Sequence, residues 1–288
     1  NFKMIDKTKT PILISTPRAG SHYVGQYIRE TFKSRGILLP GSAELFGAVD
    51  DGHLDEDIKL RHIIKFFEDT REVLHMDICS ITHACHLSNR IRILSRPNCE
   101  TLFDWFKEFY DGYQIVLLRR RNIWKQWLSY LFHKSIDIAA DQSGETFTRK
   151  RYTEDVHPWH NVQGTMKEEI LKSTIAALNP KFIHRENILQ NFLSEIRYME
   201  EEIRNYYVKG SYNNNNVRDV WLEDLTDDVL TEWYIPQDMR ENYVMNEKIL
   251  PFKIKYETYF KKPDLEVAKN KFMKLYNDEF KHYGYLVD

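Results

Sequence analysis

Two short apolar runs, each followed directly by a segment with helical spacing, most constrain how this chain can fold. Residues 11–16 (PILIST) are typical of a buried strand, and beyond Gly20 apolar side chains recur every three or four positions. Residues 113–118 (YQIVLL) are the second such strand, and a helical pattern follows at 122–134. Strands that alternate with helices favour right-handed βαβ units. We therefore expect an α/β fold with three layers, α/β/α, around a mainly parallel central sheet.

The rest of the chain adds strands and helices without a clear boundary. In the first half we expect helices at 55–74 and 100–110 and a strand at 76–82. The C-terminal half is predicted to be rich in helix, at 165–178, 186–207 and 265–282, with one late strand at 252–256. The sequence predicts one domain over residues 1–288, with a helical insertion or extension at about 164–250.

Charge and composition exclude several classes of protein. The chain has 288 residues, with 41 Lys and Arg against 43 Asp and Glu, so it is not a polycation that coats nucleic acid or an anionic membrane. Its longest strongly aliphatic stretch, residues 115–118, is too short to span a bilayer, and no basic-then-apolar leader opens the sequence. Three cysteines are too few, and odd in number, for a disulfide framework. We expect a globular cytoplasmic protein that binds no nucleic acid.

The first strand-to-helix junction, residues 16–23 (TPRAGSHY), has the character of an anion site. A helix N-terminus presents N–H groups and a partial positive charge, and Gly20 lets the backbone come close to an anion. Arg18 adds a fixed cation and Ser21 a hydroxyl donor. The same letters also suit an ordinary turn with a serine cap. The loop matches neither the Walker A pattern nor Gly-x-Gly-x-x-Gly, which disfavours an ordinary ATP or GTP hydrolase or kinase.

The second junction is strongly basic. The strand at 113–118 leads into Arg119, Arg120 and Arg121, and Ser129 follows Arg121 by eight residues. Residues 114–134 hold five Lys and Arg and no acid. A guanidinium fork and a hydroxyl suit a phosphate group. A solvated basic patch or an RNA-binding surface would show the same run of basic residues. The sequence does not indicate the aromatic-studded sheet that is typical of an RNA-binding fold.

These two junctions, in this order, resemble those of the sulfotransferases, which use 3′-phosphoadenosine-5′-phosphosulfate (PAPS). Thr-Pro-Arg-x-Gly-Ser looks like the 5′-phosphosulfate loop of that family, and Arg121 with Ser129 resembles the pair that holds the 3′-phosphate. The resemblance implies a P-loop NTPase-like sulfotransferase fold, adenosine 3′,5′-bisphosphate as product, and no metal. It also implies that the cofactor is bound by Pro17, Arg18, Ala19, Gly20, Ser21, His22, Tyr23, Arg121 and Ser129. Many members have Ser where Ala19 stands and Thr or Ser where His22 stands, but the backbone donors and Arg18 remain.

The resemblance also supplies candidates for catalysis. Residues 41–46 (GSAELF) and 140–144 (ADQSG) are similar to the trehalose 2-sulfotransferase type, in which the matching Glu44 would be the general base. His83, in Ser-Ile-Thr-His, resembles the base of the cytosolic sulfotransferases. We favour Glu44, keep His83 as the alternative, and assign Arg18 to the leaving phosphate. The favoured acceptor is a carbohydrate hydroxyl, with small phenols, lipids and peptides left open. The sequence does not determine the oligomeric state, and a homodimer stays open because some relatives are dimers.

Other interpretations of the sequence stay open. One is a nucleotide kinase-like or noncatalytic P-loop-like protein that binds a nucleotide, and a less favoured one is an RNA-binding module. A zinc site is suggested by Cys79, His83, Cys85 and His86. Their spacing fits no standard closed site, and on a continuous strand His86 would face away from the other three. The sequence therefore predicts no metal.

Overall fold

The computed structural model describes residues 10–35, 56–73, 80–88, 99–143, 186–210, 216–244 and 256–288. The chain divides into two compact units. The first comprises residues 1–119 and 195–243, and the second comprises residues 120–194 and 244–288. Each unit is described by itself.

The first unit is built on a sheet of four parallel strands in the order β2-β1-β3-β4. The strands are β1 (Pro11–Ser15), β2 (Ile81–His83), β3 (Gln114–Arg119) and β4 (Val217–Trp221). Ser15 at the end of β1 lies opposite His83 of β2 and Leu118 of β3, so the carboxyl ends of these strands meet at one edge. The expected α/β class and parallel sheet are confirmed.

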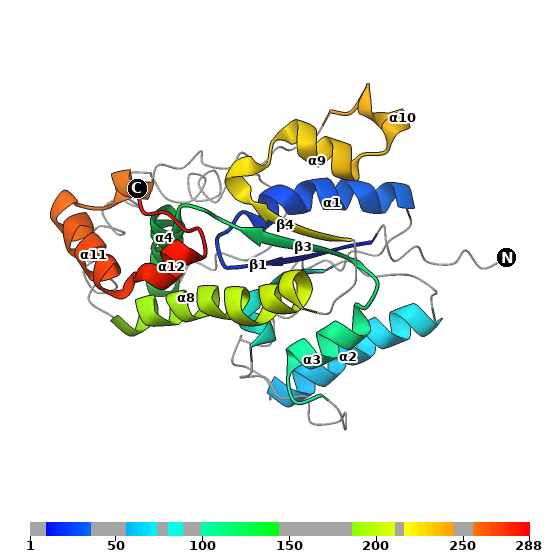
Figure 1. Ribbon diagram of the computed structural model, residues 1–288, viewed down its shortest axis with the longest axis horizontal. Coiled ribbons are helices and arrows are strands. Elements are labelled where there is room, and N and C mark those ends of the chain that lie inside the picture. Colours follow the sequence, from blue (N-terminus) through cyan, green and yellow to red (C-terminus); the bar gives the residue numbers. More distant parts are fainter. Residues whose placement is uncertain are drawn as a thin grey trace. The chain divides into compact units, whose positions relative to one another are not determined.

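Helices cover both faces of this sheet. Figure 1 shows α1 (Ser21–Arg35) and α9 (Asp227–Tyr234) on one side, and α2 (Glu56–Val73) and α3 (Leu102–Phe109) on the other. The short α10 (Gln237–Arg240) follows α9. The predicted helices at 55–74 and 100–110 are thus confirmed with small shifts at their ends. Strand order changes direction beside β1, since β2 lies on one side of it and β3 on the other.

An aromatic core packs between the sheet and α2 and α3. Phe67, Trp105 and Tyr110 are fully or almost fully buried, and Phe67 meets the Trp105 ring edge-on at 5.9 Å. Thr101 starts α3 with a capping box, in which its hydroxyl accepts from the Asp104 N–H at 3.1 Å and its own N–H donates to the Asp104 carboxylate. The cap and the apolar face therefore place α3 against the sheet, where each large aromatic side chain contributes several kcal/mol, about 3–5 on truncation to alanine.

Strand β4 was not predicted from the sequence, because its residues fall within the segment at about 164–250 that we expected to be a helical insertion or extension. Its letters, Val-Arg-Asp-Val-Trp, show no clean alternation of apolar and polar residues. As the edge strand it keeps partly exposed side chains, and its charged ones pair with distant elements. Arg218 lies over the Trp233 ring, 4.0 Å from the centroid. The helix expected at 186–207 is α8 (Glu186–Tyr198), continued by π-helical segments at Met199–Ile203 and Asn205–Lys209.

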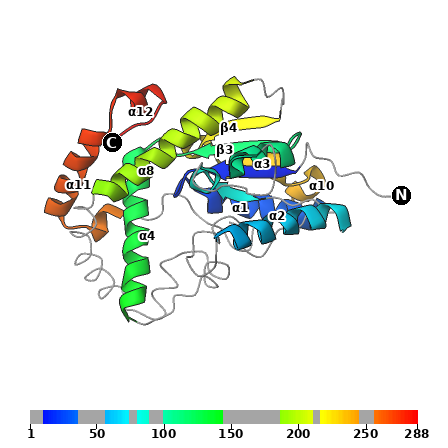
Figure 2. The ribbon, with the colours of Figure 1, turned by 90° about the horizontal axis from the view of Figure 1, so that it is seen from below.

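In the second unit the main element is α4 (Ile123–Ser143), which Figure 2 shows as one long helix. Asn122 caps it by accepting from the Lys125 N–H at 2.9 Å. The single helix expected at 265–282 is instead two, α11 (Lys262–Leu275) and α12 (Asp278–His282), because Asn277 caps a new start. Tyr256, expected to end a strand, begins a 3₁₀ turn (Tyr256–Tyr259). The described helices include none that is both long enough and apolar enough to cross a membrane.

Candidate functional site

The loop after β1 has a backbone that few sequences adopt. Arg18 has φ 64° and Gly20 has φ 95°, so two left-handed residues flank Ala19. The Ala19 N–H closes the turn on the Thr16 carbonyl at 3.2 Å. A non-glycine residue in this region costs about 1–3 kcal/mol, and such strain recurs at functional sites. Arg18 is the only non-glycine residue with positive φ in the part of the chain that the structure describes.

Gly20 is required for steric reasons as well. A Cβ built there would lie 2.6 Å from Cδ1 of Leu222, the residue that follows β4. The Gly20 carbonyl accepts hydrogen bonds from the N–H groups of Tyr23 and Val24, at 3.0 and 3.3 Å, and these bonds start α1. The loop is therefore held between the end of β4 and the first turn of the helix.

The loop and the start of α1 form a suitable place for an anion. Successive residues that alternate in handedness turn their N–H groups toward one concave side. The first turn of α1 contains no acidic residue, and the Ser21 side chain is buried beside it. Ligands of open parallel sheets bind outside the carboxyl ends, where the strand order changes direction, and the loop after β1 occupies that position. The loop conformation is compatible with the anion site inferred from the sequence of this loop, and the site itself stays a prediction.

His83 is the last residue of β2, the strand next to β1, and it interacts electrostatically with Arg18. Burial and the positive charge of Arg18 together lower the pKa of His83 to about 4. The imidazole is therefore neutral near pH 7 and has a lone pair for a proton. The structure brings these two predicted catalytic residues into one electrostatic environment.

Of the three consecutive arginines, Arg119 is committed to a buried ion-pair network. Its guanidinium binds Asp219 at 2.7 Å and Glu200 at 3.3 Å. Arg204 binds the same two carboxylates, at 2.8 Å to Asp219 and 3.3 Å to Glu200. The Trp221 ring lies under the Arg119 guanidinium, 3.8 Å from centroid to Cζ. Two cations and two anions balance, so Arg119 contributes to the fold of the first unit.

Arg121 and Ser129 belong to the second unit. Arg121 is partly exposed, and its carbonyl accepts from the Leu286 N–H at 2.8 Å. Ser129 is buried within α4. Their expected contact with one phosphate stays a prediction. Glu44, the favoured base, lies outside the described residues, and its role also stays a prediction.

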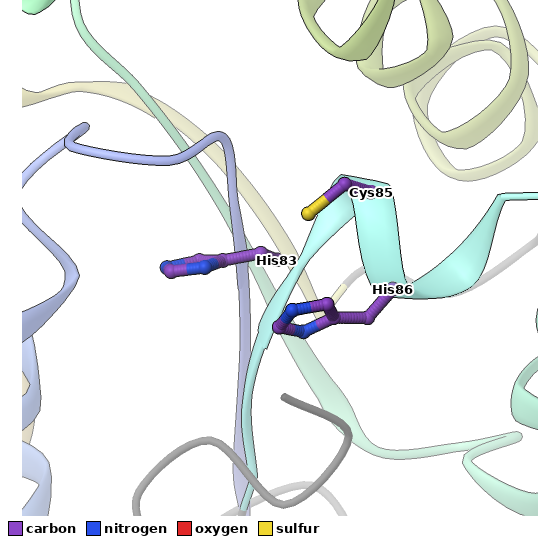
Figure 3. A group of neighbouring side chains, drawn as sticks. All are labelled: His83, Cys85 and His86. Carbon is purple, nitrogen blue, oxygen red and sulfur yellow. The ribbon is translucent and has the colours of Figure 1, made fainter. Parts of the chain in front are cut away.

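One group of side chains was set aside by the sequence reasoning for a reason that the structure overturns. Strand β2 ends at His83, and Ala84–Leu87 form a 3₁₀ turn, η3, instead of continuing the strand. His86 therefore does not face away: its ring lies 5.4 Å from that of His83, tilted by 33° (Figure 3). One donor atom from each of His83, Cys85 and His86 falls within 4.8 Å of the others. Cys79 lies outside the described residues.

Searches against protein-family models, curated proteins and solved structures found no match. The function is therefore argued from the chemistry of the site.

Proposed function

We propose that this protein is a sulfotransferase that moves a sulfuryl group from PAPS to an acceptor hydroxyl, with a carbohydrate as the favoured acceptor. The observation that carries the proposal is the left-handed Arg18–Gly20 loop at the carboxyl end of β1, whose cation acts on His83 at the end of the neighbouring strand. The loop supplies an anion site and the histidine supplies a proton acceptor, which are the two functions that sulfuryl transfer needs.

In this proposal the phosphosulfate of PAPS is bound in the loop of residues 17–23 and by the Arg18 guanidinium. The 3′-phosphate is assigned to Arg121 and Ser129, as their spacing predicts. Among the three arginines, Arg121 is the suitable one, because Arg119 is already bound by Glu200 and Asp219 and Arg120 is buried. Because Arg119 is paired with Glu200 and Asp219, it is not available to an RNA ligand, which argues against an RNA-binding module that uses all three arginines.

The transfer is an in-line displacement at sulfur. The acceptor oxygen forms a bond to sulfur as the bond from sulfur to the 5′-phosphate oxygen breaks, and the negative charge that grows on the phosphate is stabilised by Arg18 and the loop N–H groups. The acceptor proton passes to a base, either Glu44 or His83. A bound anion would offset the charge of Arg18 and so raise the pKa of His83 from about 4, while the effect of burial, the larger cause, would stay; the imidazole would become a better base in the complex.

A second candidate is a nucleotide-binding protein without sulfuryl transfer, since the loop would receive a nucleotide phosphate equally well. Thermal unfolding separates the candidates. Adenosine 3′,5′-bisphosphate should stabilise the sulfotransferase, by about 2.7 kcal/mol at a hundredfold excess over its Kd, while ATP with Mg²⁺ and RNA should not. A larger shift with ATP, or none with the bisphosphate, would reject our proposal.

Two variants make this test specific to the site. Arg18→Gln removes the cation but keeps a side chain of similar length, and it should abolish most of the shift. Arg61→Ala is the matched control, because Arg61 is exposed on α2 and should leave the shift unchanged. A screen of acceptor classes with radiolabelled PAPS then tests transfer directly, and labelling of carbohydrates is the expected result.

A further inference from the structure

The 3₁₀ turn after β2 holds three side chains that could bind a metal, and we propose that His83, Cys85 and His86 form a Zn²⁺ site with an open fourth position. The inference goes beyond the proposed transfer reaction and does not depend on it. It also departs from the expectation, based on sequence spacing, that the chain holds no metal.

The local backbone explains why these three residues meet. In a 3₁₀ turn, side chains three positions apart lie above one another. His83 is the residue before η3 and His86 is its third residue, so their rings come to one side, with the Cys85 sulfur near them (Figure 3). On the continuous strand assumed from the sequence, this grouping would not form.

The distances suit a metal after small rotations. Zn–N bonds of about 2.0–2.1 Å and Zn–S bonds of about 2.3 Å in a tetrahedron place the donor atoms about 3.3–3.6 Å apart. Here the three donor atoms lie within 4.8 Å of one another. Metal binding would require rotations of the Cys85 and histidine side chains that bring these atoms closer together.

The donor set selects the metal. One thiolate and two imidazoles suit Zn²⁺, whereas Mg²⁺ and Ca²⁺ require oxygen ligands, and no carboxylate belongs to the group. Three protein ligands leave one position for water or another ligand, as in zinc sites that are not closed. His83 and Cys85 are partly exposed as residues and His86 is buried. The positive charge of Arg18 near His83 opposes a cation, and we expect weaker binding than at a closed site with four ligands.

Cobalt provides the test, because a thiolate bound to Co²⁺ gives a charge-transfer band and a tetrahedral site gives strong visible bands. The full chain, freed of metal with a chelator and kept reduced, is titrated with Co²⁺ and then with Zn²⁺. We expect one equivalent of Co²⁺ to produce both sets of bands and Zn²⁺ to remove them. Cys85→Ser should abolish the charge-transfer band, and His86→Gln should weaken Zn²⁺ binding at least about tenfold.

Matched controls distinguish this site from the other cysteines and histidines. Cys99→Ser changes a buried cysteine in the aromatic core, and His62→Gln changes an exposed histidine on α2, so both should keep the bands and the affinity. The proposal is overturned by the absence of bands in the unaltered protein, or by bands that persist in Cys85→Ser.

A second measurement does not rely on any variant folding. The unaltered protein is alkylated with and without Zn²⁺, and the modified cysteines are located by mass spectrometry. Zn²⁺ should slow the alkylation of Cys85, because a thiolate bound to the metal is no longer free to act as the nucleophile. Equal rates at Cys85 with and without the metal would overturn the proposal. Neither experiment contains PAPS, so failure here leaves the transfer reaction to its own test.

Discussion

The charge of Arg18 acts on the imidazole of His83, and with burial it lowers the pKa of that histidine to about 4. The two residues are 65 positions apart in sequence, counting from 18 to 83. They come together because β1 and β2 are parallel neighbours with Ser15 in register with His83. The relationship links the cation that we propose to bind the anion to a neutral imidazole.

The first prediction concerns stability and pH. The folded-state pKa of His83, about 4, lies below the ordinary value of 6.5, so the unfolded chain binds the proton more readily between these values. The neutral His83 side chain therefore contributes up to about 3 kcal/mol to the free energy of unfolding. This contribution is complete above about pH 6.5 and is lost as the pH falls toward 4. Urea unfolding at pH 7.5, 6 and 5 should show a steeper loss for the native sequence than for His83→Gln. Equal slopes would contradict the lowered pKa.

The second prediction separates the two candidate bases. If Glu44 accepts the proton, Glu44→Gln should lower kcat about 10²–10⁴-fold with little change in PAPS affinity, and His83→Gln should not. The opposite pattern would assign the role to His83. The assays contain a chelator, because His83 is also a proposed zinc ligand and metal must not mask its effect. Binding of adenosine 3′,5′-bisphosphate, measured by calorimetry, checks that neither variant has lost the cofactor site.

The third prediction concerns the glycine in the loop. Gly20→Ala introduces a Cβ on a residue with φ 95°, 2.6 Å from the Leu222 side chain. The substitution should destabilise the protein by about 1–3 kcal/mol and weaken the binding of adenosine 3′,5′-bisphosphate. Gly284→Ala is the control, because Gly284 also has positive φ, at 91°, but lies near the C-terminus in the second unit. It should lower the melting temperature without changing the intrinsic affinity for the ligand. Full binding by Gly20→Ala would show that the loop conformation is not needed.

The fourth prediction contrasts two neighbouring arginines. Arg119→Ala removes one of the two arginines that pair with the buried Glu200 and the partly buried Asp219, and should cost about 3–5 kcal/mol in the free energy of unfolding. Arg121→Ala should change the free energy of unfolding by no more than about 1 kcal/mol but weaken the binding of adenosine 3′,5′-bisphosphate. Chemical denaturation and calorimetry on both variants check the contrast. If Arg119→Ala is stable and Arg121→Ala binds normally, the division of roles is wrong.

Local sequence determined the elements whose signals lie within a few residues. The apolar runs of β1 and β3 and the helical spacing of α1, α2 and α3 predicted these elements close to their observed bounds. The letters of the loop after β1 also indicated an anion site. Such signals survive because periodicity, capping and turn geometry depend on neighbouring residues.

Tertiary structure alone decided the rest. Strand β4 was missed because its charged side chains are stabilised by partners far along the chain, as Asp219 is by Arg119, 100 residues away. The same network, with Glu200 81 residues from Arg119, distinguishes a structural arginine from its neighbours. The end of β2 at His83 brought together three donors that a longer strand would have separated. A side chain's role depends on the charges and surfaces that folding places around it, and these come from distant segments that no local pattern records.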